Sequence, residues 1–309
     1  MTTKTANALT IAERTDKIIQ TVLDAVDSEH TRRAYSRALK EFMAWYHASG
    51  LHELNKATVQ RYATELREQG IGAASVNQRL SAIRKLAREA ADNGALPEAI
   101  ANGIAHVKGV RQEGTRAGNW LTKEQAQKLL DAPSVETIKG LRDRALLAVM
   151  LGCGLRRHEV ADLTFKHIQE REGRWVLVDL VGKRNKVRSV PMPSWTKKAI
   201  DEWTQAASIK SGRVFRSVNK GDKVNGDSMT PQAVRDVVFR YADAVGLGEI
   251  APHDLRRTFA RLAYKGGAGL DQIQLSLGHA SIKTTEKYLG VTQDLTDAPC
   301  DRLGLRLSK

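Results

Sequence analysis

The pattern of apolar and polar positions predicts an all-helical first third of the chain. Three segments, over residues 31–50, 58–70 and 75–94, carry apolar side chains three or four positions apart, as on one face of an α-helix. Each segment ends on a glycine, the residue that most often closes a helix. A weaker helix is expected around residues 16–26 and another after Pro97. Together these elements predict a small helical bundle.

The pattern changes from Trp120 onward, where helices and short strands are mixed. The expected helices cover 141–151, 194–208, a segment starting at Thr230-Pro231, 253–265, 270–277 and 281–289. Short strands are expected over 174–180, 187–192 and 214–216. Because strands and helices do not alternate regularly, the pattern predicts a mainly α domain with a small β-sheet rather than a βαβ fold.

Residues 110–119 (VRQEGTRAGN) separate the two patterns. They lack periodicity and contain two glycines and charges of both signs, which is typical of a linker. Structure is expected to resume where Thr122 and Gln125 have the spacing of a helix capping box. The sequence therefore predicts a helical domain over 1–109, a linker over 110–119, and a second domain with a C-terminal tail over 120–309.

The composition is that of a globular protein. Of 309 residues, 41% are hydrophobic and 27% are charged, close to ordinary globular values. No apolar run approaches the ~20 residues of a membrane span, and the first residues lack the pattern of a secretory signal. The two cysteines, Cys153 and Cys300, are too few for a disulfide framework or a four-cysteine zinc site, so we expect a reduced, cytoplasmic setting.

The charge balance makes nucleic acid the leading candidate partner, because the 49 Lys and Arg exceed the 35 Asp and Glu by a net charge of +14. The alternative is a protein that is merely basic. Two helices of the first domain carry basic polar faces, which are either simply solvated or contact phosphates. The candidate DNA-binding residues are Arg32, Arg33, Arg37, Lys40, Arg79, Arg84, Lys85 and Arg88.

Four short clusters in the second domain contain side chains suited to phosphate chemistry. In GCGLRRHEV (152–160), a glycine turn precedes Arg156 and Arg157, either of which could bind a phosphate or cap a helix. In GKRNKVR (182–188), a lysine on the turn between two strands is either a solvated charge or a cation and proton donor in a groove.

The other two clusters combine histidine with arginine or tyrosine. In PHDLRR (252–257), His253 and Arg256 lie three residues apart, so they share one helix face and could hold an anion. In LGHASIKTTEKY (277–288), His279 follows a glycine expected to end one helix, and Tyr288 lies nine residues later on the next. Taken singly, each cluster has an ordinary structural explanation.

In this order along the chain, the clusters resemble the signature of the tyrosine recombinase family, which includes phage integrases and Xer-like site-specific recombinases. GLRRHEVADL is similar to the family's first arginine box, and HDLRRTFA with LGHASIKTTEKYLGV is similar to its second. The resemblance runs from Leu121-Thr122 to Tyr288, and the helical first third resembles the family's core-binding domain. It implies a helical core-binding bundle and a catalytic domain that form a clamp around DNA.

The resemblance assigns catalytic roles to six side chains. They are Arg156, Lys183, His253, Arg256, His279 and the nucleophile Tyr288. The family's register, not the chemistry, favours Arg156 over Arg157 and Arg256 over Arg257. Lys186 is an alternative to Lys183, and Glu159 is placed to orient Arg156.

The sequence departs from the family's pattern at a few positions. Cys153 stands where threonine is usual, Arg184 where glycine is usual, and Leu289-Gly290 where a polar pair is common. These departures bear on local turn geometry and leave the six chemical groups in place.

The implied activity is site-specific DNA recombination. Tyr288 would cleave DNA through a 3′-phosphotyrosine intermediate, and strands would be exchanged between two sites via a Holliday junction, without ATP, metal or other cofactor. The implied partners are double-stranded DNA, a homotetramer formed in the synapse from protomers that are monomeric in solution, and accessory proteins, with no membrane. The tail beyond Tyr288 contains Leu303, Leu305 and Leu307, and it would dock either on its own domain or on a neighbouring protomer.

Two other functions stay open on the sequence. A non-catalytic DNA-binding regulator would bind without cutting, although all six polar positions hold competent residues. A type IB-like topoisomerase would share the chemistry and relax DNA without strand exchange, although the compact two-domain size disfavours it. Within the recombinase interpretation, dimer or cointegrate resolution and element integration or excision are both compatible with the motifs.

Overall fold

The structure is a computed structural model that describes residues 11–51, 53–111, 119–182 and 186–289. The chain divides into two compact units, Met1–Thr115 and Arg116–Lys309, and each unit has a hydrophobic core of its own. The described residues are mainly helical, with one three-stranded and one two-stranded antiparallel sheet in the second unit. The predicted fold class, mainly α with a small β-sheet, is confirmed.

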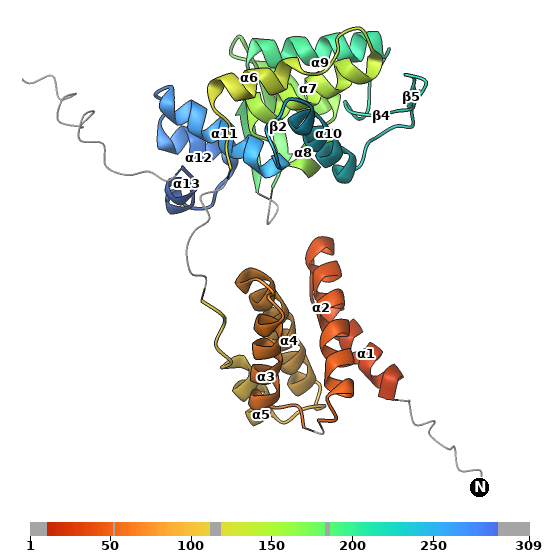
Figure 1. Ribbon diagram of the computed structural model, residues 1–309, viewed down its shortest axis with the longest axis vertical. Coiled ribbons are helices and arrows are strands. Elements are labelled where there is room, and N and C mark those ends of the chain that lie inside the picture. The colour runs from red at the N-terminus through yellow and green to blue at the C-terminus, as the bar shows by residue number, and fades with distance from the viewer. Residues whose placement is uncertain (1–10, 52, 112–118, 183–185, 290–309) are drawn as a thin grey trace, which may run out of the picture. The chain divides into compact units, whose positions relative to one another are not determined.

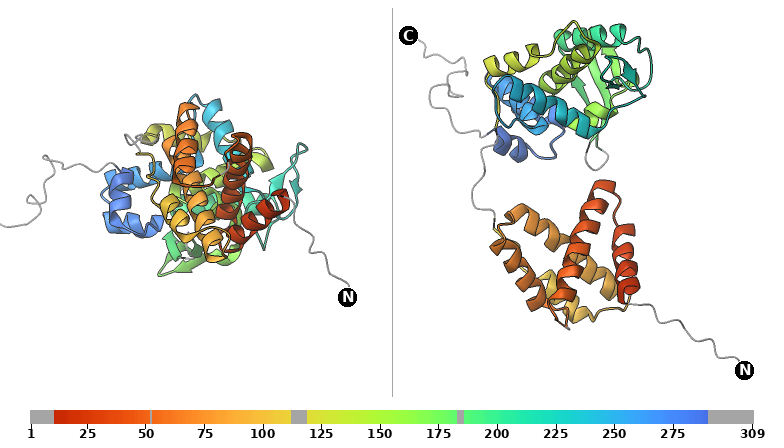
Figure 2. Two further views of the ribbon diagram at one scale, coloured as in Figure 1. Left: turned by 90° about the horizontal axis from the view of Figure 1, so that it is seen from below. Right: turned by 45° about the vertical axis from the view of Figure 1, so that its right-hand side comes forward.

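The described part of the N-terminal unit contains helices only (Figures 1 and 2). They are α1 (Ile11–Asp24), α2 (Glu29–Ala48), α3 (Lys56–Glu68), α4 (Ala73–Asp92) and α5 (Glu98–Ala105). Helices α2 and α3 begin two residues earlier than predicted, because the caps are Ser28 and Asn55. Each accepts a hydrogen bond from the backbone of the threonine three residues on, Thr31 or Thr58.

The core of the N-terminal unit contains the predicted apolar faces of α2, α3 and α4, with further apolar residues from α1 and α5. Phe42, Val59 and Leu80 are fully buried. The rings of Phe42 and Tyr62 meet edge to face, with their centroids 5.1 Å apart. The apolar periodicity of the sequence therefore identified the inner faces of these helices correctly.

The C-terminal unit is built around α7, most of whose apolar residues are buried. Its helices are α6 (Lys123–Asp131), α7 (Ile138–Cys153), α8 (Arg157–Asp162), α9 (Ser194–Ala206), α10 (Pro231–Ala244), α11 (Pro252–Lys265), α12 (Leu270–Leu277) and α13 (Ile282–Leu289), with a 3-10 turn, η1, over Phe165–His167 (Figure 1). The predicted capping box of Thr122 and Gln125 is present at the start of α6.

The main sheet has the order β1-β2-β3, with strands β1 (Ile168–Arg171), β2 (Arg174–Val181) and β3 (Val187–Pro191). Leu177 in the central strand lies opposite Ile168 on one side and Val190 on the other. A second, two-stranded sheet pairs β4 (Ser217–Val218) with β5 (Val224–Asn225).

The strand predicted over 214–216 is wrong. Val214 and Phe215 are fully buried, but they lie in irregular backbone, where the amide of Val214 donates to the carbonyl of Leu163 at 2.8 Å. Burial without sheet pairing explains why this apolar run resembles a strand. The third strand of the main sheet is β1, whose sequence IQER shows no clear alternation of apolar and polar residues.

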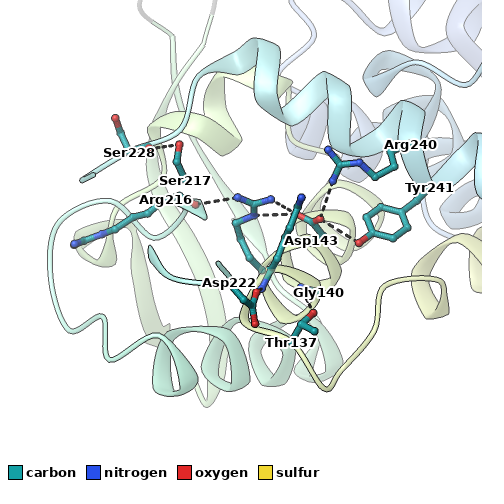
Figure 3. Close-up of polar contacts among 11 residues, drawn as sticks. Thr137, Gly140, Asp143, Arg216, Ser217, Asp222, Ser228, Arg240 and Tyr241 are labelled. Atoms are coloured by element: carbon teal, nitrogen blue, oxygen red, sulfur yellow. Dashed lines mark hydrogen bonds and ion pairs between the residues drawn. The ribbon is translucent and has the colours of Figure 1, made fainter. Parts of the chain in front are cut away.

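Two acidic groups, the half-buried Asp222 and the buried Asp143, hold the start of α7 and the end of its neighbour α10 (Figure 3). The carboxylate of Asp222 accepts hydrogen bonds from the backbone amides of Ile138 and Lys139, both at 2.8 Å, at the first turn of α7. Asp143 is fully buried and accepts from the guanidinium of Arg142 and from the Tyr241 hydroxyl, the latter at 3.1 Å. These contacts hold the scaffold that carries the glycine turn after α7.

The end of α7 is the site of Cys153, which is buried and in the reduced form. Burial raises the pKa of this thiol to about 12. Among the described residues, no three His, Cys, Asp or Glu side chains are grouped so that they could hold a metal ion. Nor, across the same ranges, is any helix both long and apolar enough to cross a membrane.

Candidate active site

A glycine turn between α7 and α8 positions Arg156. Gly154 adopts a left-handed conformation with φ of +60°, which favours glycine over other residues. A Cβ at this position would lie 2.6 Å from the ring of Phe259 on α11, so the close approach of that helix also requires glycine. The chain leaves this turn with Arg156 as the N-cap of α8.

Glu159 is a buried carboxylate, 4% exposed, that binds Arg156 twice. It accepts from the backbone amide of Arg156 and from its Nη1, each at 2.8 Å. A second arginine, Arg188, donates Nη1 and Nη2 to the two oxygens of the same carboxylate, both at 2.8 Å. The expectation that Glu159 is placed to orient Arg156 thus has a geometric basis.

The ionisation of Glu159 follows from these contacts. Burial by itself would raise the pKa of this carboxyl, but hydrogen bonds and charge from Arg188, followed by those of Arg156, lower it to about 2. The group is therefore a carboxylate at neutral pH. Because it is anionic and fixed, it holds both guanidinium groups in place.

Arg188 was not singled out from the sequence, although it ties three elements together. Its side chain is 8% exposed, and its Nε donates to the carbonyl of Ser276 in the last turn of α12 at 2.9 Å. On β3 it shares a sheet face with the buried Val190. An arginine at an inward strand position, which predicts a buried anionic partner, was the signal that could have identified it.

Helix α11 carries the predicted His253 and Arg256. Arg256 is 1% exposed; its Nη1 donates to the carbonyl of Gly154 at 2.6 Å, and its Nη2 donates to the carbonyl of Leu277. Arg256 therefore joins the turn before Arg156 to the end of α12. His253, one turn earlier, is more exposed; desolvation of the ring and then the positive charges of Arg257 and Arg256 lower its pKa.

His279 lies just beyond a second left-handed glycine. Gly278 closes α12 with φ of +63°, and a Cβ there would lie 2.8 Å from Cδ of Arg188. The Nδ1 atom of His279 is 2.9 Å from the hydroxyl of Thr285, a fully buried residue of α13. The predicted Gly-His motif therefore has both its backbone turn and the orientation of its ring fixed by neighbouring side chains.

Electrostatics shows that the predicted groups share one environment. Desolvation lowers the pKa of His279 to about 4, and the charges of Arg256, then Arg156, His253 and Arg188, act in the same direction. The imidazole is neutral at pH 7. Four of the six predicted catalytic residues, on α8, α11 and the α12–α13 turn, are thus brought together.

The structure describes little of the two remaining residues of the predicted catalytic set, Lys183 and Tyr288. Lys183 lies outside the described residues, although the glycine before it is described. A Cβ on Gly182 would be 3.4 Å from Nη1 of Arg188 and 3.6 Å from Nη1 of Arg156, so the end of β2 reaches the arginines. The alternative lysine, Lys186, is exposed at the start of β3.

For Tyr288, the structure describes the backbone, in the last turn of α13, but not the side chain. Its helix is the one whose Thr285 contacts His279, so the backbone of the predicted nucleophile belongs to the same assembly of elements. The apolar tail residues Leu303, Leu305 and Leu307 lie outside the described residues.

The candidate DNA-binding residues of the N-terminal unit fall into two groups. The exposed group lies on α2 and α4; Arg33 and Arg37 pair there with Glu29 and Glu41. The other members of this group are Lys40 and Arg88. The ion pairs of Arg33 and Arg37 are surface pairs, which are weak enough to be exchanged for a phosphate contact.

The second group is tied to the protein itself. Arg32 donates to the carbonyls of Leu23 and Val26 at the end of α1, and Arg84 donates to the carbonyl of Val107. In addition, Arg79 pairs with Glu41 and Lys85 pairs with Glu89. Contacts of this kind order the surface around the exposed cations.

Comparison with known proteins covers both units. Residues 119–294 match the Phage integrase family, and residues 22–94 match its N-terminal SAM-like domain. The chain is 33% identical to the tyrosine recombinase XerC of Pelobacter propionicus over 274 residues, 86% of each chain. It is 29% identical to XerD of Pseudomonas aeruginosa over 277 residues, which cover 86% of this chain and 88% of that protein.

Solved structures share the fold at low sequence identity. A lambda integrase dimer bound to a COC′ core site superposes with a TM-score of 0.68 at 18% identity, covering 93% of this chain and 80% of that one. XerH bound to its palindromic difH substrate superposes with a TM-score of 0.67 at 21% identity, covering 84% and 76%. Because the family match alone spans more than half of the sequence, this chain belongs to the phage integrase family and is a tyrosine recombinase, an enzyme that breaks and rejoins DNA at specific sites.

Proposed function

We propose that this recombinase cuts DNA with Tyr288 as the nucleophile and with Arg156, Arg256 and His279 bound to the scissile phosphate. One observation carries the proposal: these three side chains come from separate elements, and each is held by a buried or main-chain partner. Arg156 is fixed by Glu159, Arg256 by two carbonyls, and His279 by Thr285. Donors fixed in advance stabilise developing charge without reorganising, and in many enzymes this effect accounts for most of the rate enhancement.

The proposed cleavage step is a transesterification. The Tyr288 oxygen attacks the scissile phosphorus, a phosphorus–oxygen bond forms, and the bond to the 5′ oxygen breaks. Tyr288 loses its proton and the departing oxygen gains one, so the products are a 3′-phosphotyrosine and a free 5′ hydroxyl. The reverse attack by a 5′ hydroxyl from a second duplex joins the exchanged strand, and no ATP is required because the ester bond is conserved.

We assign the remaining groups of the site to proton transfer. We assign the proton donor for the 5′ oxygen to Lys183, with Lys186 as the alternative, and assistance in removing the tyrosine proton to His253. The neutral state of His279 suits a hydrogen-bond donor. If the Thr285 hydroxyl donates to Nδ1, the ring keeps its proton on Nε2, which is then available to a phosphate oxygen.

Double-stranded DNA is the proposed partner. The charge of +14 and the exposed cations of α2 and α4 support it, as do the solved relatives, lambda integrase on a core site and XerH on difH. We assign the N-terminal unit to core-site binding and the C-terminal unit to catalysis. Strand exchange via a Holliday junction would take place in a homotetramer in the cytoplasm, with the two units of each protomer forming a clamp on the DNA.

Covalent capture tests this proposal. Protein–DNA adducts are isolated from cells that express the chain, and sequencing of the attached DNA defines the site. A synthetic duplex of that site, nicked a few nucleotides to the 3′ side of the scissile phosphate so that the short fragment bearing the free 5′ hydroxyl is lost, should then trap an adduct with the wild-type protein and none with Tyr288→Phe. Tyr264→Phe, which alters an exposed tyrosine at the end of α11, is the matched control and should form the adduct normally.

The other outcomes separate the alternatives. Site binding without any wild-type adduct would leave a DNA-binding regulator. An adduct accompanied by relaxation of supercoils, with no recombinant product from two-site substrates, would indicate a topoisomerase. An adduct that persists in Tyr288→Phe would contradict the assignment of the nucleophile.

A further inference from the structure

We propose that Arg261, on α11, is a positioning residue that sets the direction of Tyr288 by holding the end of α13. The inference rests on the proposed role of Tyr288. Helix α13 spans eight residues and packs beside α11 and α12 at one end of the C-terminal unit (Figures 1 and 2). A helix this short is not stable by itself, so tertiary contacts must fix its direction.

Two buried side chains hold the helix against its neighbours. Thr285 is fully buried and meets His279. Leu289 is buried in a small cluster with Ala260 of α11 and with Ile273 and Leu277 of α12. These contacts attach α13 to α11 and α12 through an apolar cluster and one side-chain hydrogen bond.

Arg261 supplies a directional contact at the last turn of α13. Its Nη1 donates a hydrogen bond of 2.8 Å to the carbonyl of Leu289. The final carbonyls of a helix lack partners within the helix and carry the negative end of its dipole, so a guanidinium there satisfies both needs. The residue whose carbonyl is held directly follows Tyr288.

The guanidinium is itself held by an aromatic ring. Cζ of Arg261 lies 3.8 Å above the centroid of the Trp120 indole, which is within the range of a cation–π contact. The Trp120 side chain is 39% exposed. The structural role of this exposed ring is to stack on the guanidinium of Arg261. The chain of contacts thus runs from Trp120 through Arg261 to the backbone beside Tyr288.

The loss of Arg261 should affect one chemical step, the attack of Tyr288 on the phosphorus. Arg261 holds the backbone after Tyr288 and has no assigned part in binding the phosphate, so its loss should misdirect the nucleophile and leave the phosphate-binding groups intact. A displacement of about 1 Å at a reacting group can lower a rate by ~100-fold. We therefore expect tyrosine attack to suffer and steps that do not use the tyrosine to continue.

Two assays on the captured site separate these effects. The first measures the rate of adduct formation on the nicked duplex. The second uses a strand that ends in a 3′-p-nitrophenyl phosphate, which a 5′ hydroxyl attacks with release of p-nitrophenolate. This joining needs the phosphate-binding groups but not the attack of Tyr288, so Tyr288→Phe should retain it. DNA affinity and thermal unfolding are measured alongside.

Arg261→Gln should form the adduct at least about tenfold more slowly and join the activated strand within about twofold of wild type. Arg261→Lys, which keeps a cation and a donor, should recover much of the adduct rate, and Trp120→Leu should show a weaker loss in the same direction. Arg235→Gln is the matched control, because Arg235 also stacks on an aromatic ring, Phe239, with 4.4 Å to the centroid, but on α10. It should behave as wild type.

The proposal is overturned if Arg261→Gln forms the adduct at the wild-type rate, or if it loses adduct formation and activated-strand joining equally. Should Arg261→Gln unfold, the same two rates are compared for Arg261→Lys and Trp120→Leu. A loss confined to adduct formation supports the proposal, whereas wild-type adduct formation or an equal loss in both assays overturns it. A wild-type protein that forms no adduct but joins the activated strand would instead contradict Tyr288 as nucleophile, and with it both proposals.

Discussion

A single carboxylate organises the cationic side chains of the candidate site. Glu159 receives two contacts from Arg156 and two from Arg188, and it is the one anion that the described residues place directly on either guanidinium. The positive groups that we propose to bind the scissile phosphate repel one another when no DNA is bound. A buried anion offsets that repulsion and holds Arg156 in a fixed direction, so stability and function depend on the same residue.

Glu159→Gln should destabilise the C-terminal unit in a pH-dependent way. The pKa of Glu159 is lowered from 4.5 to about 2, so its contribution is complete above pH 4.5 and is lost as the pH falls toward 2. The size of this shift corresponds to about 3 kcal/mol. Urea unfolding should therefore show a difference between wild type and variant that is large at pH 7 and clearly smaller at pH 3.

Asp201→Asn is the control for this prediction. Asp201 also pairs with a cation, Lys197, but its side chain is 54% exposed on α9, so its loss should cost less than about 1 kcal/mol at either pH. A Glu159→Gln protein as stable as wild type at pH 7 would contradict the account of this residue.

At the scale of elements, two glycine turns bring distant helices to one place. Gly154 ends α7 and delivers Arg156, while Gly278 ends α12 and delivers His279. Both are left-handed, and both are approached closely by another element, α11 in the first case and β3 in the second. The two turns are joined by Arg256, which binds a carbonyl at each.

Gly278→Ala should cost more than the strain of its backbone alone. A left-handed alanine costs about 1–2 kcal/mol, and the added Cβ must also displace Arg188, whose Cδ would lie 2.8 Å away. Gly246→Ala is the matched control, since φ there is +71° and nothing lies within 4 Å of the added Cβ. Chemical denaturation should rank Gly278→Ala as the less stable variant, and adduct formation should slow in Gly278→Ala only. Equal behaviour of the two variants would contradict the packing argument.

Much at this scale followed from the sequence. The helix caps at Thr122 and Thr230, the glycine stops and the start of α8 beside Arg156 are local signals, and local chemistry encodes them. By contrast, β1 is too short to show a pattern, and the buried run at 214–216 is apolar because of tertiary packing rather than sheet pairing. The local pattern of apolar and polar residues therefore predicts neither the strand β1 nor the absence of a strand at 214–216.

The residues of the candidate site also fall into those that the sequence predicts and those that it does not. The motifs singled out Arg156, His253, Arg256 and His279 as candidates, because each stands in a short, recognisable segment. Arg188 binds Glu159 from 29 positions away, and Thr285 matters through its contact with His279. Contacts of this kind form only when separate elements pack together, so they are hard to predict from a single sequence.

At the scale of the whole molecule, the two units divide the work of binding and cutting that we propose. The N-terminal unit presents exposed cations on α2 and α4, while other basic residues on the same helices donate to main-chain carbonyls or form less exposed ion pairs. This division predicts which cations contribute to DNA affinity and which contribute to folding.

Lys40→Ala and Arg88→Ala should each weaken DNA binding and lower its dependence on salt. Removing a cation that binds one phosphate should reduce the slope of log K against log salt by about 0.9. Arg84→Ala should leave the slope unchanged and lower the free energy of unfolding, because its guanidinium holds the carbonyl of Val107. Binding titrations at several salt concentrations measure this, and a slope that changes only for Arg84→Ala would reverse the assignment.

The most direct test of the central claim is whether Arg156 is needed because the scissile phosphate is charged. Adduct formation is compared on the nicked site with an ordinary phosphodiester and with a neutral methylphosphonate at the scissile position, for wild type, Arg156→Ala and the neighbouring Arg157→Ala. We predict that Arg156→Ala is slower than wild type by about 100-fold or more on the phosphodiester and by less than about tenfold on the methylphosphonate, while Arg157→Ala follows wild type on both. An equally large loss for Arg156→Ala on the two substrates, or a loss that appears in Arg157→Ala instead, would contradict the account.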